Sequence, residues 1–164
     1  MNKPTTIALA DKRRDWYLVQ SKPKQDERAE ENLVRQGYVC CRPRCRRQRL
    51  VRGTSQFVEE SLFPGYLFIH MPAGTNWTPL SSTRGVTKVV AFGGRPLAVA
   101  DELIEALQLR SSIELATYSD ADEAIVTVEG ELSGVDSIFV SIDGGERVLL
   151  LMDIMCRQAK LCMQ

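Results

Sequence analysis

The side chains of this chain that could take part in covalent chemistry are five cysteines and a single histidine. The cysteines are Cys40, Cys41, Cys45, Cys156 and Cys162. Arginines lie beside the first three, and a neighbouring positive charge lowers the pKa of a thiol and makes the thiolate available. A thiol enzyme also needs a base, and the only histidine, His70, falls within a predicted strand. We therefore predict that the protein is not an enzyme.

The cysteine spacing also disfavours a metal site and a disulfide framework. The first three cysteines follow the pattern Cys-Cys-x3-Cys, which is not the ligand spacing of a zinc-binding motif. The cysteines are odd in number, and the first residues lack the apolar core of a secretory signal. We predict free thiols, no metal and no cofactor. No apolar run approaches the roughly 18–20 residues that span a bilayer, so we expect a cytoplasmic protein without a membrane partner.

Arginine is the second group of functional side chains, and it is concentrated in one segment. Residues 42–52, with the sequence RPRCRRQRLVR, hold six arginines in eleven positions. The chain has no net charge, but residues 1–58 hold 14 Lys/Arg and 6 Asp/Glu, whereas residues 59–164 hold 7 and 15. Pro43 and Gly53 indicate an extended or hairpin-forming segment. Its arginine density favours contact with nucleic acid or an acidic protein over a solvated loop.

Strands and helices must position these side chains. Apolar and β-branched runs predict strands at 15–20, 38–41, 57–60, 62–70 and 86–92. Helical spacing predicts a helix at 24–36, with Pro23 at its start and Gly37 just past its end, and a second helix at 100–111. This order of elements predicts an α+β fold, in which helices cover an open sheet.

The run from Leu62 to Ile69 is more apolar than a surface strand needs. In an extended strand, Tyr66 and Phe68 share one face while Leu67 and Ile69 take the other. Pro64 must lie at a bulge, a bend or a sheet edge, because it cannot donate a hydrogen bond to a neighbouring strand. We interpret the run as a docking surface.

We divide the chain into a disordered leader at 1–13, a first domain at 14–112, a linker at 113–123 and a small second unit at 124–164. The second unit has conflicting local preferences. Residues 124–128 and 137–142 are β-branched, and the turn signal DGGE at 143–146 favours a small β-barrel. Residues 147–162, however, show helical spacing of Leu and Met. Such disagreement predicts two packings of similar free energy.

Several separated motifs, in order, make the chain resemble the NusG family of transcription elongation factors. They are Trp16-Tyr17, the helix before Gly37, the run Leu62-Phe63-Pro64-Gly65-Tyr66-Leu67-Phe68, and Arg84-Gly85-Val86 with Phe92-Gly93. The tail from Ile125 resembles that family's KOW module, with Gly130 and Gly134 in place and Ser137 where a third glycine is common. Within the family, the chain is most similar to the RfaH antiterminator branch, through Val51-Arg52-Gly53, Glu60-x-Leu62-Phe63-Pro64, Ser82-Thr83-Arg84 and Gly145-Glu146-Arg147.

The resemblance implies a NusG-type N-terminal domain and a C-terminal domain that is an α-helical hairpin when autoinhibited and a β-barrel when released. It implies a specialised antitermination and elongation factor that binds RNA polymerase, suppresses pausing and termination, is recruited through a DNA element, and is autoinhibited by its C-terminal domain. The implied partners of the monomer are the polymerase clamp helices and opposite cleft wall, non-template DNA, and a small-subunit ribosomal protein.

The resemblance also implies three sets of residues. The polymerase-binding set is Tyr17, Leu62, Phe63, Tyr66, Phe68 and Phe92, with Asn76, Trp77 and Thr78 where the family branch has a His-Thr-Thr motif. The DNA-binding set is Lys22, Asn32, Arg35, Gln36, Thr83 and Arg84. The interdomain set is an ion pair of Glu60 with Arg147, and the masking side chains Phe139, Val148, Leu151, Met152 and Met155.

Two other functions stay open on the sequence. One is a general NusG-type elongation factor with a permanent β-barrel tail and no DNA specificity. The other is an RNA-binding, translation-associated module, which the arginine-rich segment and the KOW-like tail would suit.

Overall fold

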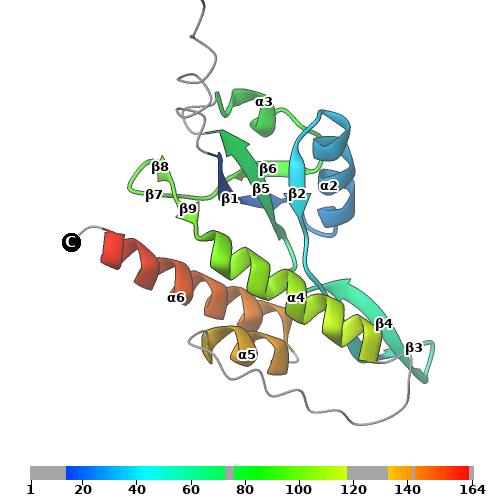
Figure 1. Cartoon of the computed structure of the whole chain (residues 1–164). Coiled ribbons are helices and arrows are strands. Elements are labelled where there is room, and N and C mark those ends of the chain that lie inside the picture. The colour runs from blue at the N-terminus through cyan, green and yellow to red at the C-terminus, as the bar shows by residue number, and fades with distance from the viewer. Residues whose placement is uncertain (1–13, 73–75, 118–132, 142, 163–164) are drawn as a thin grey trace, which may run out of the picture. The chain divides into compact units, whose positions relative to one another are not determined.

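The computed structural model describes residues 14–72, 76–117, 133–141 and 143–162 (Figure 1). These residues fall into two compact units, and each unit is built from separate stretches of sequence. The first unit contains residues up to 41 and residues 65–101, and the second contains residues 42–64 and those from 102 onward. Among the described residues, no helix is both long and apolar enough to cross a membrane.

The first unit is built on an antiparallel sheet whose central strand is β1. The strands are β1 Arg14–Ser21, β2 Val39–Cys41, β5 Tyr66–Pro72, β6 Val86–Val89 and β9 Ala98–Val99. Their order is β2-β5-β1-β6, and β9 also pairs with β1. In the register of β1 with β5, Tyr17 lies opposite Ile69 and Leu18 lies opposite Phe68. This register decides which aromatic side chains share a face of the sheet.

One face of this sheet forms a hydrophobic core with helix α2, Asp26–Arg35. The strands contribute Tyr17, Val19, Leu67, Ile69, Met71 and Val86, and other buried members are Ala29, Leu33 and Leu80. On the opposite face, Leu18 and Phe68 are also fully buried. A strand that is apolar on both faces reads as a continuous apolar run, which explains the unusual hydrophobicity of residues 66–71.

Helix α2, Asp26–Arg35, starts two residues later and ends one residue earlier than predicted. Pro23 does not begin the helix, because residues 22–25 form a turn in which Gln25 N–H donates to the Lys22 carbonyl at 3.0 Å. At the other end, Gly37 has φ +95°, its N–H donates to Val34, and Tyr38 N–H donates to Leu33. These two bonds form a Schellman motif, which confirms the role predicted for Gly37.

The segment predicted as one strand at 86–92 forms two separate strands. Strand β6 ends at Val89, and β7 Ala91–Phe92 pairs instead with β8 Arg95–Pro96 in a small two-stranded ribbon. Gly93 and Gly94 join them with φ of +62° and +79°, the backbone that a two-residue hairpin turn requires. A short helix, α3 Thr78–Ser81, precedes β6.

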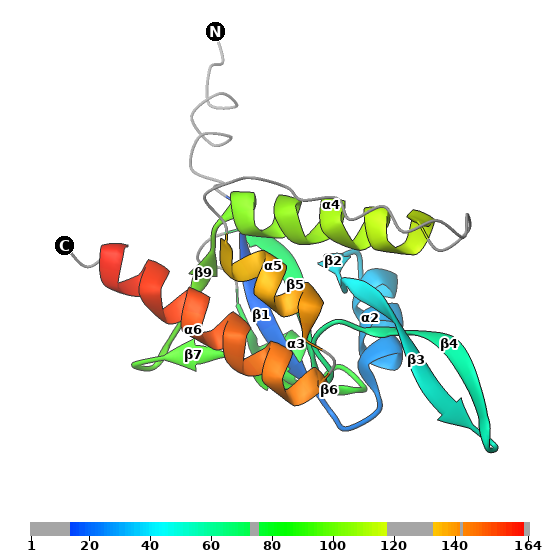
Figure 2. The same ribbon diagram turned by 90° about the horizontal axis from the view of Figure 1, so that it is seen from below.

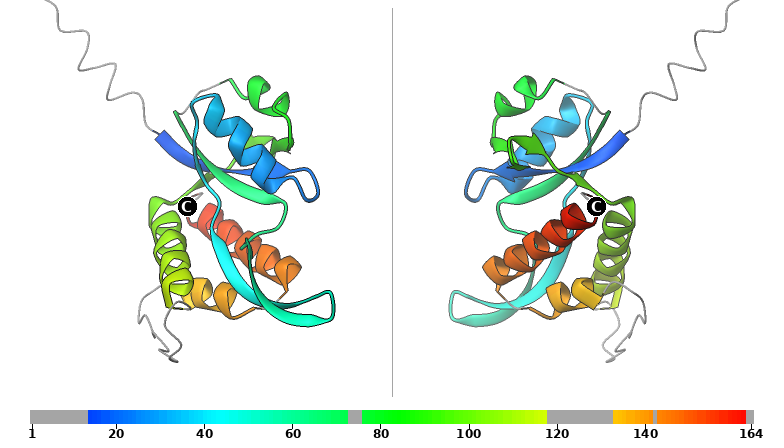
Figure 3. Two further views of the ribbon diagram at one scale, coloured as in Figure 1. Left: turned by 90° about the vertical axis from the view of Figure 1, so that its right-hand side faces the viewer. Right: turned by 90° about the vertical axis from the view of Figure 1, so that its left-hand side faces the viewer.

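The second unit begins with a hairpin of β3 Arg44–Val51 and β4 Thr54–Ser61 (Figure 3). Arg52 and Gly53 have φ of +52° and +80°, as a type I′ turn demands, so the predicted hairpin is confirmed. Residues 62–64, predicted as part of a strand, instead follow the hairpin as a connection. There Leu62 N–H donates to the Pro43 carbonyl at 2.8 Å.

Three helices complete the second unit: α4 Asp101–Thr117, whose first residue belongs to the first unit, α5 Ser133–Val140 and α6 Gly144–Cys162 (Figure 2). Helix α4 extends six residues past the predicted end at Ser111, into the segment expected to be a linker. The Ser111 hydroxyl on α4 accepts from Arg44 N–H at 3.1 Å and donates to the Arg44 carbonyl at 2.6 Å, which joins α4 to the hairpin.

Residues 133–140 and 144–162 of the tail are helical, so residues 137–140 do not form the strand that their β-branched pattern favoured. The turn signal at 143–146 is instead the start of α6. Asp143 Oδ1 accepts from Gly145 N–H at 3.2 Å, which is the bond of a helix N-cap. Residues 124–128, predicted as a strand, lie outside the described residues.

Candidate functional site

In the first unit, all six residues predicted to bind DNA gather around α2 and the loop at 82–85. Asn32 Nδ2 donates to the Arg84 carbonyl at 3.0 Å, and Gln36 Nε2 donates to Thr83 Oγ1 at 2.9 Å. At the start of the α2 turn, Lys22 N–H donates to the Gly85 carbonyl at 2.8 Å. Residues distant in sequence therefore form one surface.

The loop can approach α2 this closely because residue 85 is glycine. Gly85 has φ +93°, and a Cβ at this position would lie 2.9 Å from the backbone nitrogen of Ala29. Thr83 is buried, and its hydroxyl donates to the Pro79 carbonyl at 3.0 Å. Held in this way, the surface exposes three cations, Lys22, Arg35 and Arg84. The partly exposed Asn32 lies beside them.

Asp26 has a positioning role that the sequence did not reveal. Its Oδ1 accepts from the Ser21 hydroxyl at 2.7 Å, and its Oδ2 accepts from Gly65 N–H at 2.9 Å. As an acid in the first turn of α2, Asp26 also suits the positive end of the helix dipole. The carboxylate in fact joins the end of β1, the start of α2 and the residue before β5, and so fixes the α2 surface relative to the sheet.

The polymerase-binding set does not form a single surface. Tyr17 lies opposite Ile69 and belongs to the core on the α2 face, whereas Tyr66 and Phe68 project from the other face of β5. The ring of Tyr17 meets Trp77 edge-on at 4.7 Å between centroids, and burial, with a smaller contribution from Asp15, raises the pKa of its hydroxyl. The expected grouping of Tyr17 with Tyr66 is therefore wrong in its geometry, because the register separates them.

The other members of that set differ in exposure. Phe92 is 40% exposed, Tyr66 and Trp77 are half-buried, and Phe68 is fully buried. Asn76 and Thr78 are exposed at the start of α3, where Asn76 Oδ1 accepts from Thr78 N–H at 3.1 Å. Leu62 and Phe63, in the second unit, are buried.

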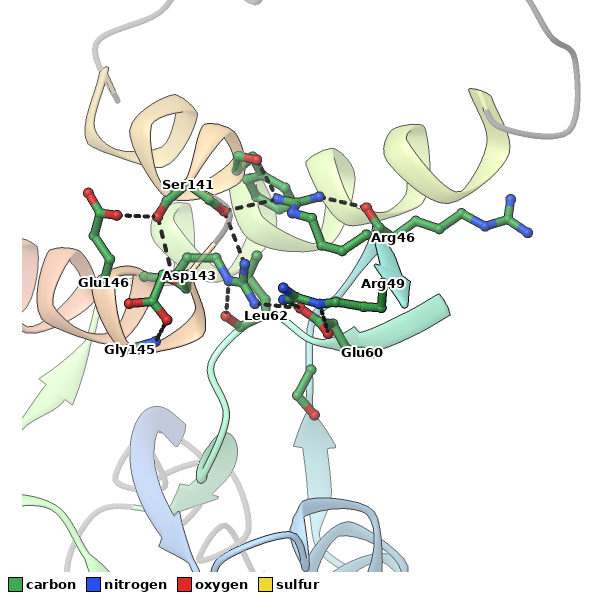
Figure 4. A network of polar contacts seen from close by, with 12 residues as sticks. Arg46, Arg49, Glu60, Leu62, Ser141, Asp143, Gly145 and Glu146 are labelled. Carbon is green, nitrogen blue, oxygen red and sulfur yellow. Dashed lines mark hydrogen bonds and ion pairs between the residues drawn. The ribbon is translucent and has the colours of Figure 1, made fainter. Parts of the chain in front are cut away.

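The second unit brings Glu60 and Arg147 together, as predicted for this pair (Figure 4). Glu60 Oε1 lies 3.0 Å from Arg147 Nη2 and 2.7 Å from Arg49 Nη2. The Arg147 side chain is fully buried, and its Nε donates to the Leu62 carbonyl at 2.6 Å while Nη1 donates to the Ser141 carbonyl at 3.0 Å. A buried guanidinium is tolerated only with such partners, and here one carboxylate and two carbonyls supply them.

Two opposing effects set the pKa of the Glu60 carboxyl. Burial raises it, but hydrogen bonds from Arg49 and then Arg147 outweigh burial, so the pKa lies below its ordinary value. The hydrogen bond to Glu60 in turn raises the pKa of the Arg49 guanidinium. Glu60 is thus held as a carboxylate between an arginine of its own hairpin and an arginine of α6.

Arg47 and Arg49 are contact residues that sequence reasoning missed, because the arginine-rich segment was expected to contact nucleic acid or an acidic protein. Alternation along β3 puts both on the same face of the hairpin as Glu60. Arg47 Nη2 donates to the Phe139 carbonyl at 2.5 Å and to the Ser141 carbonyl at 3.4 Å. The alternation of side chains along β3 could have found them. It places residues 45, 47 and 49 on one face, and Cys45 lies opposite Glu60 in the hairpin.

On the masking side of α6, Leu151 and Met155 are buried, as is Phe139 on α5, while Val148 and Met152 are half-buried. The face of α6 that is buried therefore follows Arg147, Leu151 and Met155 at intervals of four residues. Gly134 on α5 lies against Ile154 on α6, where a Cβ would be 2.8 Å from Ile154 Cδ1, so the two helices approach closely.

Cys40 does not have the environment of a nucleophilic thiol. Cys40, Cys41, Cys45 and Cys156 are thiols that form no disulfide. Burial, and to a smaller extent Glu30 and Cys41, raises the pKa of Cys40 to about 12, which opposes the thiolate rather than favouring it. In the part of the chain that the structure describes, no group of three or more His, Cys, Asp and Glu side chains could hold a metal ion.

Comparison with known proteins identifies the class. A family model described as "Transcription termination factor nusG" matches residues 14–108, and the proteins it represents are transcription factors, not enzymes. Because the match covers more than half of the chain, this chain belongs to the NusG family, whose members bind RNA polymerase. The matched residues contain the whole sheet of the first unit, α2 and the hairpin.

A solved structure titled "Domain interaction in Thermotoga maritima NusG" is also similar to this chain. The two are 22% identical, with a TM-score of 0.43, and the alignment covers 74% of this chain and 67% of the Thermotoga chain. We draw no argument about function from so distant a likeness.

Proposed function

We propose that this NusG-family protein is an RfaH-type antiterminator. In this proposal the protein is cytoplasmic and binds RNA polymerase. It suppresses pausing and termination, and it is recruited by a DNA element in the non-template strand. Its tail inhibits it until recruitment.

The observation that carries the proposal is the contact of α6 with the start of the apolar run and with Glu60, two residues before it. Arg147 bonds both the Glu60 carboxylate and the Leu62 carbonyl, and Gly144 lies against Pro64. Leu62 and Phe63, which the family resemblance assigns to polymerase binding, are buried in this unit. A tail held here denies those two side chains to any partner, which is what autoinhibition requires.

The remaining polymerase contacts of the proposal are Tyr66, Phe68, Phe92 and the exposed pair Asn76 and Thr78. A few aromatic anchors can supply most of the affinity of an interface. Tyr17 and Trp77, which pack on each other in the core, act in this proposal by supporting the domain rather than by direct contact.

The proposed DNA contact is the surface of α2 and the loop at 82–85. Lys22, Arg35 and Arg84 supply charge toward phosphates or guanine edges, and Asn32 and Gln36 supply amides of the kind that pair with adenine. The bonds from Asn32 and Gln36 to the loop support this role, because they set the loop in place before DNA arrives.

The released state of the proposal is a β-barrel tail that binds a small-subunit ribosomal protein. Its support is the family resemblance together with the β-branched residues at 137–142, of which residues 137–140 lie in α5. The competing function, a general elongation factor with a permanent β tail, is less well supported because α5 and α6 are helical.

The test is polymerase binding by the full chain and by two neighbouring variants. Glu60→Ser removes the carboxylate that bonds Arg147, whereas Glu59→Ser removes the next carboxylate, which is exposed and bonds Arg44 at 2.7 Å. We expect Glu60→Ser to bind polymerase more tightly than the parent, and Glu59→Ser to bind like the parent. If NMR shows that the tail is displaced in Glu60→Ser and all three proteins still bind polymerase equally well, autoinhibition is contradicted.

A further inference from the structure

Arg47 connects the hairpin to the C-terminal end of α5. Its Nη2 donates to the carbonyls of Phe139 and Ser141, and its Nη1 donates to the Arg46 carbonyl at 2.8 Å. The last bond is within the hairpin, so the guanidinium is already oriented by the strand that carries it. Arg147 adds a second donor to the Ser141 carbonyl.

The end of a helix is a place where such donors are needed. The last four carbonyls of an α-helix have no partner within the helix, and they carry the negative end of its dipole. At the end of α5, two arginines from other elements supply both the hydrogen bonds and the positive charge. Phe139 is further held by Arg110 of α4, whose guanidinium carbon lies 5.8 Å from the centre of the ring.

The geometry of the two Arg47 bonds is incompatible with an extended strand at residues 139–141. One nitrogen that lies 2.5 Å from one oxygen and 3.4 Å from another limits the two oxygens to a separation of 5.9 Å at most. In a β-strand, the carbonyls of residues i and i+2 point the same way and lie about 6.6 Å apart. In an α-helix they are closer, so one arginine nitrogen can reach both.

From this geometry we infer that Arg47 is a specificity-determining residue that recognises the helical form of the tail. Phe139 lies in the last turn of α5 and Ser141 follows the end of that helix. Arg47 can bond both carbonyls only when residues 139–141 are not extended as in a β-strand. The ion pair of Glu60 with Arg147 depends on the position of the tail. The Arg47 bonds depend on the backbone conformation of the tail. The inference rests on the proposed function in one respect, namely that the tail has a second, β-rich form.

A conformational equilibrium shifts only by the difference in contact energy between its two states. Because Arg47 contacts the helical form, its loss weakens the helical form, and the end of α5, where the Phe139 carbonyl loses this donor, opens more often.

The test is hydrogen exchange in the full-length protein, followed at the amides of α5. In Arg47→Gln we expect these amides to exchange about tenfold faster or more, since hydrogen bonds to a charged donor are among the stronger ones. The matched control is Arg44→Gln, which removes the same charge from an exposed position of the same strand. In that control we expect exchange within about twofold of the parent.

Arg47→Lys is the conservative variant, and it keeps the charge but loses the planar fork. We expect exchange between that of the parent and that of Arg47→Gln. If α5 exchanges at the same rate in Arg47→Gln and Arg44→Gln, the inference is wrong. Faster exchange of the α2 amides in Arg47→Gln would mean that this variant destabilises the protein beyond the tail. In that case Arg47→Lys is compared with Arg44→Gln instead. Equal exchange rates of the α5 amides in these two variants overturn the inference.

Polymerase binding by the same variants separates this inference from the proposed function. Faster α5 exchange in Arg47→Gln together with unchanged polymerase affinity supports recognition by Arg47 and contradicts autoinhibition. Tighter polymerase binding by Glu60→Ser together with unchanged α5 exchange in Arg47→Gln supports autoinhibition and overturns the role of Arg47.

Discussion

Gly144 lies so close to Pro64 that a Cβ at position 144 would be 2.6 Å from the proline Cγ. This contact joins the first turn of α6 to the segment that follows the hairpin. Neither residue has a reactive or charged side chain. The pair nevertheless sets how closely the tail approaches the start of the apolar run. A proline ring cannot swing aside as a flexible side chain does, so the approach requires a glycine.

The first prediction compares Gly144→Ala with Gly145→Ala. The first change forces a methyl group against the ring, and overpacking of this kind costs about 1–3 kcal/mol. At Gly145 the nearest atoms are the Asp143 carboxylate oxygens at 3.6 and 3.8 Å, so an alanine fits there and favours the helix by about 0.5–1 kcal/mol. NMR chemical shifts of α6 should change widely in Gly144→Ala and only locally in Gly145→Ala. Similar shift changes in both would contradict the contact.

The second prediction concerns acid. The pKa of Glu60 is lowered in the folded protein from its ordinary 4.5, so its contribution to tail docking is complete above pH 4.5. That contribution is lost as the pH falls further and through the folded pKa. We expect the docked tail to weaken below pH 4.5 more steeply in the parent than in Glu60→Gln, in which position 60 no longer titrates.

NMR line positions of α6 in the two proteins between pH 7 and pH 3 measure the effect. Other carboxyl groups titrate in both proteins, so the difference between the two curves isolates Glu60. Parallel curves would show that the carboxylate of Glu60 does not hold the tail.

Local structure was the part of the fold that sequence reasoning predicted well. The end of α2 follows from a glycine that can adopt positive φ, and the hairpin at 44–61 follows from an Arg-Gly turn between two extended segments. These features depend on a few adjacent residues, so a pattern in the sequence is enough to find them.

Features that depend on distant residues were missed. The separation of Tyr17 from Tyr66 follows from the register of β1 with β5, which no pattern within either strand reveals. The DGGE signal was interpreted as a β-turn, but Asp143 caps a helix whose glycine is needed against Pro64. Arg47 seemed to be one charge among six, and only its contact with the end of α5 distinguishes it.

The third prediction concerns the glycine between α2 and its loop. Gly85→Ala introduces two costs, a side chain at φ +93° and a Cβ that would lie 2.9 Å from the Ala29 backbone nitrogen. Gly37→Ala introduces only the first, because Gly37 has φ +95° with no atom within 4 Å of its Cβ position. A left-handed backbone costs a non-glycine residue about 1–2 kcal/mol.

Chemical denaturation should therefore show Gly37→Ala destabilised by about that amount, and Gly85→Ala destabilised by at least about 1 kcal/mol more. Equal losses in the two variants would mean that the loop moves away from α2 without cost. The surface proposed for DNA would then not be held in place by the backbone.

The fourth prediction concerns DNA binding by that surface. Arg84→Ala and Arg35→Ala each remove an exposed cation of the α2 surface, and Arg95→Ala removes an exposed cation of β8 outside it. If Arg35 or Arg84 contacts a phosphate, its loss weakens binding to all sequences and reduces the salt slope of log K by about one. If it contacts a guanine edge, its loss costs about 1–3 kcal/mol at one base position and relaxes sequence preference there.

Fluorescence anisotropy of labelled single-stranded DNA at several salt concentrations distinguishes these outcomes, and Arg95→Ala should bind like the parent. Asn32→Ala provides a further comparison, because it removes the bond to the Arg84 carbonyl without changing charge. We expect it to weaken DNA binding while the salt slope stays that of the parent. Binding of Arg35→Ala and Arg84→Ala at the level of Arg95→Ala would show that DNA does not use this surface.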